Sequence, residues 1–186
     1  MAVIQTVKDA AHKAITPIIK ALSLPVRPFG MLPAAFTAYL STGLPSSRIG
    51  QTMTVPGHRV AASAGTHDQD GTMAGIPYAV CVDLRVADLR GQEVKSLLLK
   101  LWDAGFAAWY RCANYPEDHW SGATHIHAIW VAAPCKRSVR GQVHDFCARP
   151  CKTGLASHLP YHFLQPSIEQ QNKVAAAFLP RNPASG

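Results

Sequence analysis

The stretch AVCVDLRV, residues 79–86, decides how the chain around it must be organised. Its side chains alternate between apolar and more polar, which is the two-residue period of a β-strand with one buried face. The apolar face comprises Val80, Val82, Leu84 and Val86. Asp83 lies on the opposite face, beside Cys81 and Arg85. The pattern therefore predicts a strand that buries one side and holds a carboxylate on the other.

The sequence after this strand predicts one amphipathic helix and two more strands. In GQEVKSLLLKLWDAGF, residues 91–106, apolar side chains recur at helical spacing, and Gly105 is placed to cap the helix. FAAWYR (106–111) and HIHAIWVA (125–132) read as strands joined by a loop. We expect an α+β fold in which the helix packs on one face of a small antiparallel sheet. Asp83 then lies on the open face.

Further segments flank this body. Residues 1–50 combine apolar residues at helical spacing with a stretch rich in proline and glycine, so we interpret them as an N-terminal helical arm. Residues 51–165 are the expected domain, with a short helix that ends near Ala148, and residues 166–186 are the expected C-terminal tail. We find no transmembrane segment and no recognisable signal peptide.

The composition favours a globular protein that binds an anionic partner. Of 186 residues, 48% are hydrophobic and 16% are charged, and the formal net charge is +7. This charge suits nucleic acid, an acidic membrane surface or a bacterial cell wall. The basic residues are scattered, which argues against a dedicated nucleic-acid binder. The five cysteines form no CxxC pair, so a cysteine-ligated metal is not expected. One disulfide bond is an alternative that the sequence leaves undecided. Cys81 is more simply interpreted as a buried hydrophobic residue.

Two histidines stand together at the start of the strand at 125–132. His125 and His127 are two positions apart, so in a strand they point to the same face, although such a pair is equally compatible with solvated side chains. His67, in the loop ASAGTHDQDG, and Asp83 precede this pair. Two histidines and an aspartate suit a catalytic zinc, because they leave one position open for water. The order of the four residues is more specific than any one of them.

Four segments resemble a family of zinc peptidases. GHRVAASAGTH, YAVCVDLRV, GFAAWYR and HIHAIW are similar to segments of the D-alanyl-D-alanine carboxypeptidases and their lysostaphin-like and hedgehog-like relatives, which share a peptidase M15-like domain. The resemblance implies that Zn²⁺ is held on the open face of the sheet by His67, Asp83 and His127. It also implies that His125 faces the zinc-bound water and takes part in proton transfer.

The same resemblance includes one arginine and one difference in spacing. Arg59, in GHR, is similar to the arginine that steadies the substrate or the developing oxyanion in the carboxypeptidases. Asp83 follows His67 by sixteen positions, a longer gap than is usual in the family. We therefore expect an insertion in QDGTMAGIPY, unless Asp70 is the ligand. Asp83 is preferred because it belongs to a strand, whereas Asp70 lies in a glycine-containing turn.

A second difference concerns the catalytic base. Thr124 stands where the carboxypeptidases have an acidic residue. The role of base therefore moves to His125, or to a residue of the preceding loop. The candidates in that loop are Glu117, Asp118 and His119.

The activity that the resemblance implies is zinc-dependent hydrolysis of peptide bonds in bacterial peptidoglycan, by a cell-wall lysin or an antibacterial toxin. A basic surface suits this anionic substrate. Without a recognisable signal, we expect the protein to reach the cell wall or periplasm by another route, or to be phage-encoded; a delivery or immunity partner is unknown. The alternatives are a non-catalytic zinc-binding or cell-wall-binding domain on the same fold and, less favoured, a basic nucleic-acid-binding protein.

Overall fold

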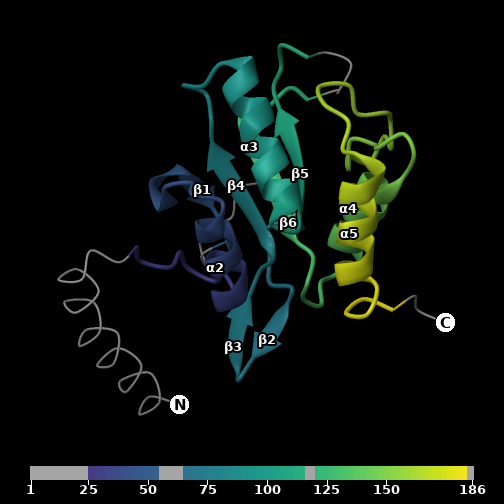
Figure 1. Ribbon diagram of the computed structural model, residues 1–186. Helices are drawn as coiled ribbons and strands as arrows, with labels where there is room; N and C mark the ends of the chain where they lie inside the picture. Colours follow the sequence, from purple (N-terminus) through teal and green to yellow (C-terminus); the bar gives the residue numbers. More distant parts are fainter. Residues whose placement is uncertain (1–24, 55–64, 116–119, 184–186) are drawn as a thin grey trace.

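The computed structural model describes residues 25–54, 65–115 and 120–183, and its centre is a four-stranded antiparallel sheet (Figure 1). In spatial order the strands are β1 (Ile49–Gln51), β4 (Cys81–Arg85), β6 (His125–Trp130) and β5 (Phe106–Arg111). A separate hairpin pairs β2 (Gly71–Met73) with β3 (Ile76–Tyr78). Together with the helices around it, this sheet confirms the predicted α+β fold.

The helices lie around the sheet in two groups. They are α2 (Pro33–Ser41), α3 (Gly91–Asp103), α4 (Arg137–Cys147) and α5 (Ile168–Phe178), and a 3₁₀ turn, η1, spans Ser46–Arg48. In Figure 1, α3 lies across the sheet, while α4 and α5 lie beside each other next to β5. Helix α3 ends before Gly105, whose φ of +87° is the left-handed conformation expected of a capping glycine.

The core forms between α3 and the apolar face of the sheet. Val82 and Leu84 of β4 are completely buried. Helix α3 buries Val94, Leu97, Leu98, Leu101 and Trp102. Trp102 also donates its indole N–H to the carbonyl of Ala108 in β5, at 3.0 Å, so the largest side chain of the helix is fixed to the sheet. Asp83 points to the opposite face, as predicted.

The strand register places the polar residues of that opposite face in rows. Asp83 of β4 is directly opposite His127 of β6, and His127 is directly opposite Trp109 of β5. In the next row, His125 is opposite Arg111. Because directly opposite residues share a face, one row runs from the carboxylate through the imidazole to the indole.

Residues 25–51 contain more regular secondary structure than their proline and glycine content indicates. The apolar stretch AAFTAYL lies in α2, which begins with Pro33 in its first turn and buries Ala35, Phe36 and Tyr39. β1 pairs with β4 as an edge strand of the sheet. Residues 25–51, which the sequence analysis assigns almost entirely to the N-terminal arm, therefore contribute to the core and the sheet. The helix expected near the N-terminus falls within residues 1–24, outside the described residues.

The long gap between His67 and Asp83 contains the hairpin β2–β3. The two residues of its turn, Ala74 and Gly75, have φ values of 51° and 74°, which is the combination that a tight type I′ turn requires. Gly71 at one end of the hairpin pairs with Tyr78 at the other. The chain therefore leaves the body and returns to nearly the same point, so the extra residues do not separate His67 from Asp83.

Two further observations concern the state of the cysteines and the length of the helices. All five cysteines lie in the described residues and are free, and Cys81 is only 1% exposed, which agrees with its interpretation as a buried hydrophobe. Within the residues that the structure describes, no helix is both long enough and apolar enough to cross a membrane.

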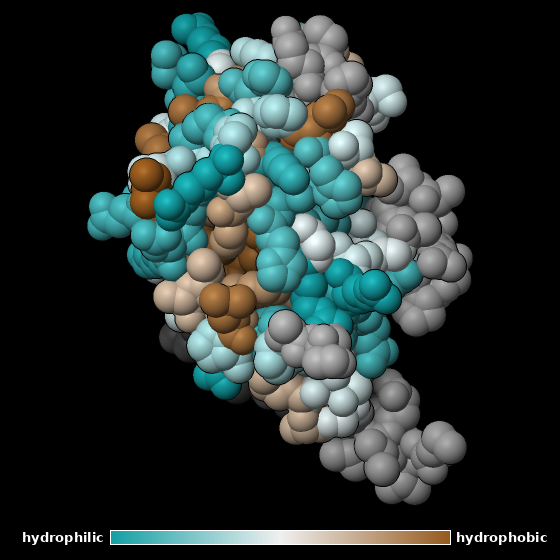
Figure 2. All heavy atoms as spheres, turned by 90° about the vertical axis from the view of Figure 1, so that its right-hand side faces the viewer, coloured by the Kyte–Doolittle hydropathy of each residue, from teal (hydrophilic) through white to brown (hydrophobic). Residues whose placement is uncertain are grey.

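The C-terminal segment contains α5, a helix that the sequence analysis missed. Ser167 caps this helix, because its hydroxyl oxygen accepts a hydrogen bond from the backbone N–H of Gln170, at 3.1 Å. Val174 and Phe178 are buried, and Gln171 donates its side-chain amide to the carbonyl of Phe146 in α4, at 2.9 Å. Figure 2, which views the side of the molecule that carries α4 and α5, shows mainly hydrophilic residues with separate hydrophobic patches.

The packing of α5 gives a first prediction. Phe178 is 2% exposed, so we expect Phe178→Ala to lower the free energy of unfolding by about 3–5 kcal/mol, through lost burial and the cavity that remains. Leu179→Ala is the matched control, because Leu179 is 54% exposed and its loss should change stability by less than about 0.5 kcal/mol. Urea unfolding followed by circular dichroism measures both values. Equal effects would show that α5 does not pack on the body.

Candidate metal centre

The structure brings His67, Asp83 and His127 together on the open face of the sheet. Nε2 of His67 lies 3.1 Å from Oδ2 of Asp83, and Nδ1 of His127 lies 2.8 Å from Oδ1 of the same carboxylate. One ligand atom from each residue lies within 4.8 Å of the other two. Three residues far apart in the sequence thus present two nitrogens and one carboxylate to a common point.

His67 is oriented by the backbone around it. Its Nδ1 lies 2.8 Å from the carbonyl oxygen of Thr52, which follows β1, and its own carbonyl accepts a hydrogen bond from the N–H of Thr54, at 2.8 Å. A carbonyl oxygen can only accept, so Nδ1 carries a proton, and Nε2 is the ring nitrogen that faces Asp83. Fixing the tautomer through the second ring nitrogen is the usual way in which proteins orient a histidine ligand.

His127 is held by the sheet and by an aromatic neighbour. It is 5% exposed, and its ring stacks on Trp109 with a centroid separation of 6.2 Å. Its Nε2 is buried, and no described group forms a hydrogen bond with it. Protonating the ring would therefore bury a positive charge with only one of its two N–H groups hydrogen-bonded, which favours the neutral form.

The electrostatics of the pair prepare it for a cation. Burial raises the pKa of Asp83, but hydrogen bonds and charges from His127 and His67 outweigh this effect and hold the pKa well below its usual range. Burial lowers the pKa of His127 to about 4, although Asp83 opposes the change. At neutral pH the site therefore offers an ionised carboxylate and a neutral imidazole, the protonation states that metal binding requires.

These three residues fit a divalent metal ion. Two imidazoles and one carboxylate are a donor set that zinc accepts, and three protein ligands leave a fourth position for water or substrate. The same donors also suit other first-row transition metals, so the geometry indicates a metal site without selecting the metal.

A pocket of about 350 Å³ opens beside the three residues. His67, Asp83, His125 and His127 all line it. Its other walls come from separate parts of the chain and include Gln51, Arg111, Trp120, Gln142 and Leu155. The candidate ligands are therefore accessible to a small ligand while their rings remain largely buried, a combination typical of catalytic metal sites.

His125 borders the pocket without belonging to the group of three. Its Nδ1 lies 2.8 Å from the carbonyl oxygen of Ala123, and its Nε2 lies 3.7 Å from Oδ1 of Asp83. The carbonyl of Ala123 fixes the tautomer, so Nε2 has the free lone pair on the pocket side. The preceding residue, Thr124, points its hydroxyl to the sulfur of Cys112, at 3.6 Å. The imidazole of His125, and not Thr124, is therefore placed to accept a proton.

Asp70, the alternative ligand, has a different role. Its carboxylate is buried, accepts a hydrogen bond from the backbone N–H of Val80 at 2.8 Å, and lies 3.3 Å from Nζ of Lys136. Lys136 also donates to the carbonyls of Thr66 and Asp68, on either side of His67. Asp70 and Lys136 thus tie the loop of His67 to the start of α4. The preference for Asp83 agrees with this geometry.

Four predicted site residues lie outside the residues that the structure describes, and several residues that line the pocket were not predicted. Arg59, Glu117, Asp118 and His119 lie in the segments 55–64 and 116–119, outside the described residues. Arg111, Gln142 and the loop at Gly154–Ala156 line the pocket but do not appear among the predicted site residues. The alternation of FAAWYR could have placed Arg111 on the same face of the strand as Trp109. No signal in the sequence indicates that the loop at Gly154–Ala156 reaches the pocket.

No protein-family profile, curated protein or solved structure matches this chain. The resemblance to zinc peptidases therefore stays a prediction, and the site is interpreted from its own geometry.

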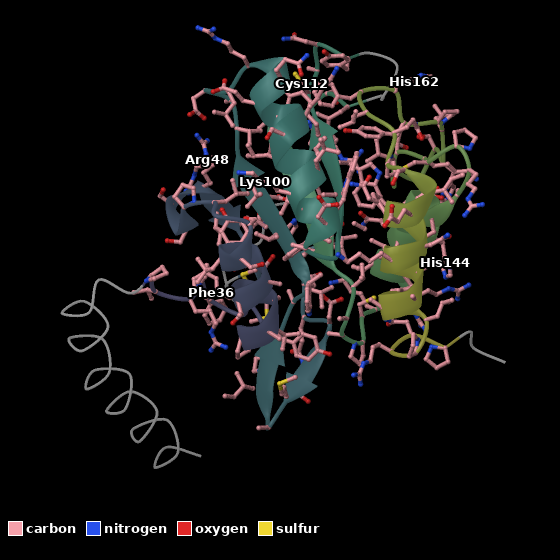
Figure 3. All side chains as sticks on the ribbon, viewed as in Figure 1. Phe36, Arg48, Lys100, Cys112, His144 and His162 are labelled. Carbon is pink, nitrogen blue, oxygen red and sulfur yellow. The ribbon has the colours of Figure 1, made fainter. Side chains whose placement is uncertain are left out.

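The convergence of ligand atoms gives a second prediction. Wild-type protein loaded with zinc and then desalted should retain about one metal ion per chain, whereas His127→Ala should lose it, because one of three ligands is removed. His144→Ala is the control, since His144 lies on α4, away from the sheet (Figure 3), and does not line the pocket. Elemental analysis measures the metal. Equal retention by all three proteins would contradict the proposed ligand set.

The lowered pKa of His127 gives a third prediction, for protein kept metal-free with a chelator. In the unfolded chain this histidine titrates near its ordinary pKa of 6.5, and in the fold near 4, so the unfolded state binds more protons between these values. The contribution of a neutral His127 to the free energy of unfolding is therefore fully present above pH 6.5. It is lost as the pH falls toward 4, and the loss is on the order of 3 kcal/mol. Thermal unfolding at pH 7 and 4.5 measures the change.

The control for this prediction is His127→Gln, which keeps a hydrogen-bond donor for Asp83 but cannot titrate. Its melting temperature should depend less on pH over the same interval. An identical pH dependence in wild type and variant would show that another group governs the acid response.

Proposed function

We propose that this protein is a zinc-dependent hydrolase of peptide bonds in bacterial peptidoglycan. The observation that carries the proposal is the convergence of His67, Asp83 and His127 at the wall of an accessible pocket. The resemblance in sequence supports zinc as the metal and an amide as the substrate. The net charge of +7 supports an anionic polymer as the place of action.

In the proposed reaction, the metal and the side chains of the protein have separate roles. When bound, zinc would polarise the scissile carbonyl and make a water molecule more acidic. His67, Asp83 and His127 hold the metal, with Asp83 ionised and His127 neutral at the pH of the reaction. His125, whose Nε2 faces the pocket, takes a proton from the attacking water and returns it to the leaving amine. The buried ring of Trp109 excludes solvent behind His127.

The direct test uses purified peptidoglycan and zinc-loaded protein, with released fragments identified by mass spectrometry. We expect new peptide termini with wild type and with His144→Ala, and none with His127→Ala. If the metal-loaded wild type releases no fragments while the protein still sediments with peptidoglycan, the chain is a binding domain.

That second candidate, a non-catalytic zinc-binding or cell-wall-binding domain, is favoured by one observation. Asp83 is the single carboxylate among the described residues that line the pocket, and it is occupied by two histidines. An enzyme on this site therefore depends on His125, or on the segment 116–119, for its base.

The role of His125 gives a fourth prediction. His125→Ala should retain zinc, because its side chain is not among the three converging ligands, but should lower kcat by about 10²–10⁴, the usual contribution of a general base. Elemental analysis and the rate of fragment release measure the two properties on the same sample. An unchanged rate with zinc retained would assign the base to another residue.

A further inference from the structure

Exposed hydrophobic side chains gather at the end of the molecule that carries the hairpin β2–β3, at the bottom of Figure 1. Eight large hydrophobic side chains are exposed among the described residues, and four of them belong to two neighbouring segments. Met73 and Ile76 lie in the hairpin, and Val26 and Phe29 lie in the segment before α2; each is more than half exposed. We call these four residues the hairpin patch. Such a concentration indicates an interaction surface, since exposed hydrophobic residues are otherwise scattered singly.

Hydrogen bonds hold the two segments side by side. The backbone N–H of Ala79, just after β3, donates to the carbonyl of Gly30 at 3.0 Å, and Met31 forms a parallel β-bridge with Ala79. Residues of both segments line a hollow of about 280 Å³, with Arg27 on one side and Met73 on the other. No described residue lines both this hollow and the pocket of the metal centre. The hairpin patch is therefore a separate surface.

The hairpin presents an apolar tip on a fixed base. At the base, Tyr78 is buried, and its hydroxyl donates to the carbonyl of Pro134 at 2.9 Å. At the tip, Met73 and Ile76 are directly opposite each other, so both side chains leave the same face of the hairpin. The turn between them is Ala74–Gly75. The tip can therefore enter an apolar medium without burying a polar or charged side chain, which would be costly.

The sequence that leads into the hairpin patch is basic. Residues 1–24 contain Lys8, Lys13 and Lys20 against a single acidic residue, Asp9, and the exposed Arg27 follows. The apolar residues that recur there at helical spacing are Val3, Val7, Ala10, Ala14, Ile18 and Leu22. Residues 1–24 lie outside the described residues, so this observation rests on sequence alone. A basic sequence with an amphipathic period is typical of segments that bind a membrane surface.

We propose that the hairpin patch inserts into the surface of a bilayer that contains anionic lipids. Such a surface combines negative headgroups with an apolar interior, and the chain offers basic residues beside apolar side chains. The net charge of +7 favours the same partner. A protein partner would be bound in part through hydrogen bonds, for which the tip of the hairpin offers no side chain. The proposal does not depend on hydrolysis, because the patch is separate from the metal pocket.

The test measures how strongly the full-length protein binds lipid vesicles in a flotation assay. Vesicles of phosphatidylcholine and phosphatidylglycerol in equal amounts are compared with vesicles of phosphatidylcholine alone. We expect wild type to bind the anionic vesicles at least about tenfold more strongly, because each basic residue near the surface adds attraction. The double variant Met73→Thr/Ile76→Thr keeps the charge and suits a strand. It should bind the anionic vesicles about tenfold more weakly than wild type, because two apolar side chains no longer enter the bilayer.

Ile168→Thr/Leu179→Thr is the matched control, because Ile168 and Leu179 are equally exposed hydrophobic residues at the two ends of α5. This variant removes a similar apolar surface elsewhere, also without a change of charge, and should bind the vesicles as wild type does. If the hairpin variant fails to fold by circular dichroism, Val26→Thr/Phe29→Thr removes the other half of the patch and decides the question in the same assay.

Two results would overturn the proposal. The first is equal binding of wild type and the hairpin variant to anionic vesicles, because charge alone would then explain the attraction. The second is no binding of wild type to either kind of vesicle. In both cases, a wild-type dimer that the hairpin variant converts to a monomer in sedimentation equilibrium would assign the hairpin patch to a second copy of this chain instead.

Discussion

The pairing of β4 with β6 is the constraint on which the site depends. Asp83 and His127 face each other because the two strands pair in one register. A shift of one residue would turn Asp83 into the core and bring Val82 and Leu84 to the surface, since the side-chain period of a strand is two. The burial of these apolar residues under α3 therefore holds the register, and the register brings the carboxylate to the imidazole. Hydrophobic packing on one face thus fixes polar geometry on the other.

Much of this arrangement could be predicted from the sequence, because the signals are periodic and local. The alternation of residues 79–86, the amphipathic pattern of residues 91–106 and the strand at 125–132 correspond to β4, α3 and β6. The same alternation assigned Asp83 to the open face. Placing His67 near it required more, since a loop histidine has no periodicity; the order of residues and the resemblance identified it, and the structure brings it within reach of Asp83.

Other parts could not be predicted because their cause is tertiary. Residues 25–51 are rich in proline and glycine, which indicates loops, yet α2 forms because Ala35, Phe36 and Tyr39 find a surface to bury against. The helix α5 carried a local signal, a serine followed three residues later by glutamine, but one of its three buried residues, Gln171, is polar, so its apolar stripe is incomplete. The position of Arg111 in the pocket wall depends on two tryptophans and on the pairing of β5 with β6, which no single segment of the sequence contains.

Trp109 joins the parts of the molecule that the sequence keeps apart. Its ring contacts His127 of β6, Arg111 of β5 and Phe146 of α4, and its N–H is bound by the carbonyl of Lys152. The shortest piece of chain that contains all three candidate ligands, residues 67–127, therefore lacks Phe146 and Lys152, two of the groups that contact this ring. The candidate ligands and their support therefore depend on each other. A fragment limited to the ligand-bearing strands would carry the chemistry without the whole scaffold, and a change at Phe146 of α4 or at Lys152 would reach the metal centre through Trp109.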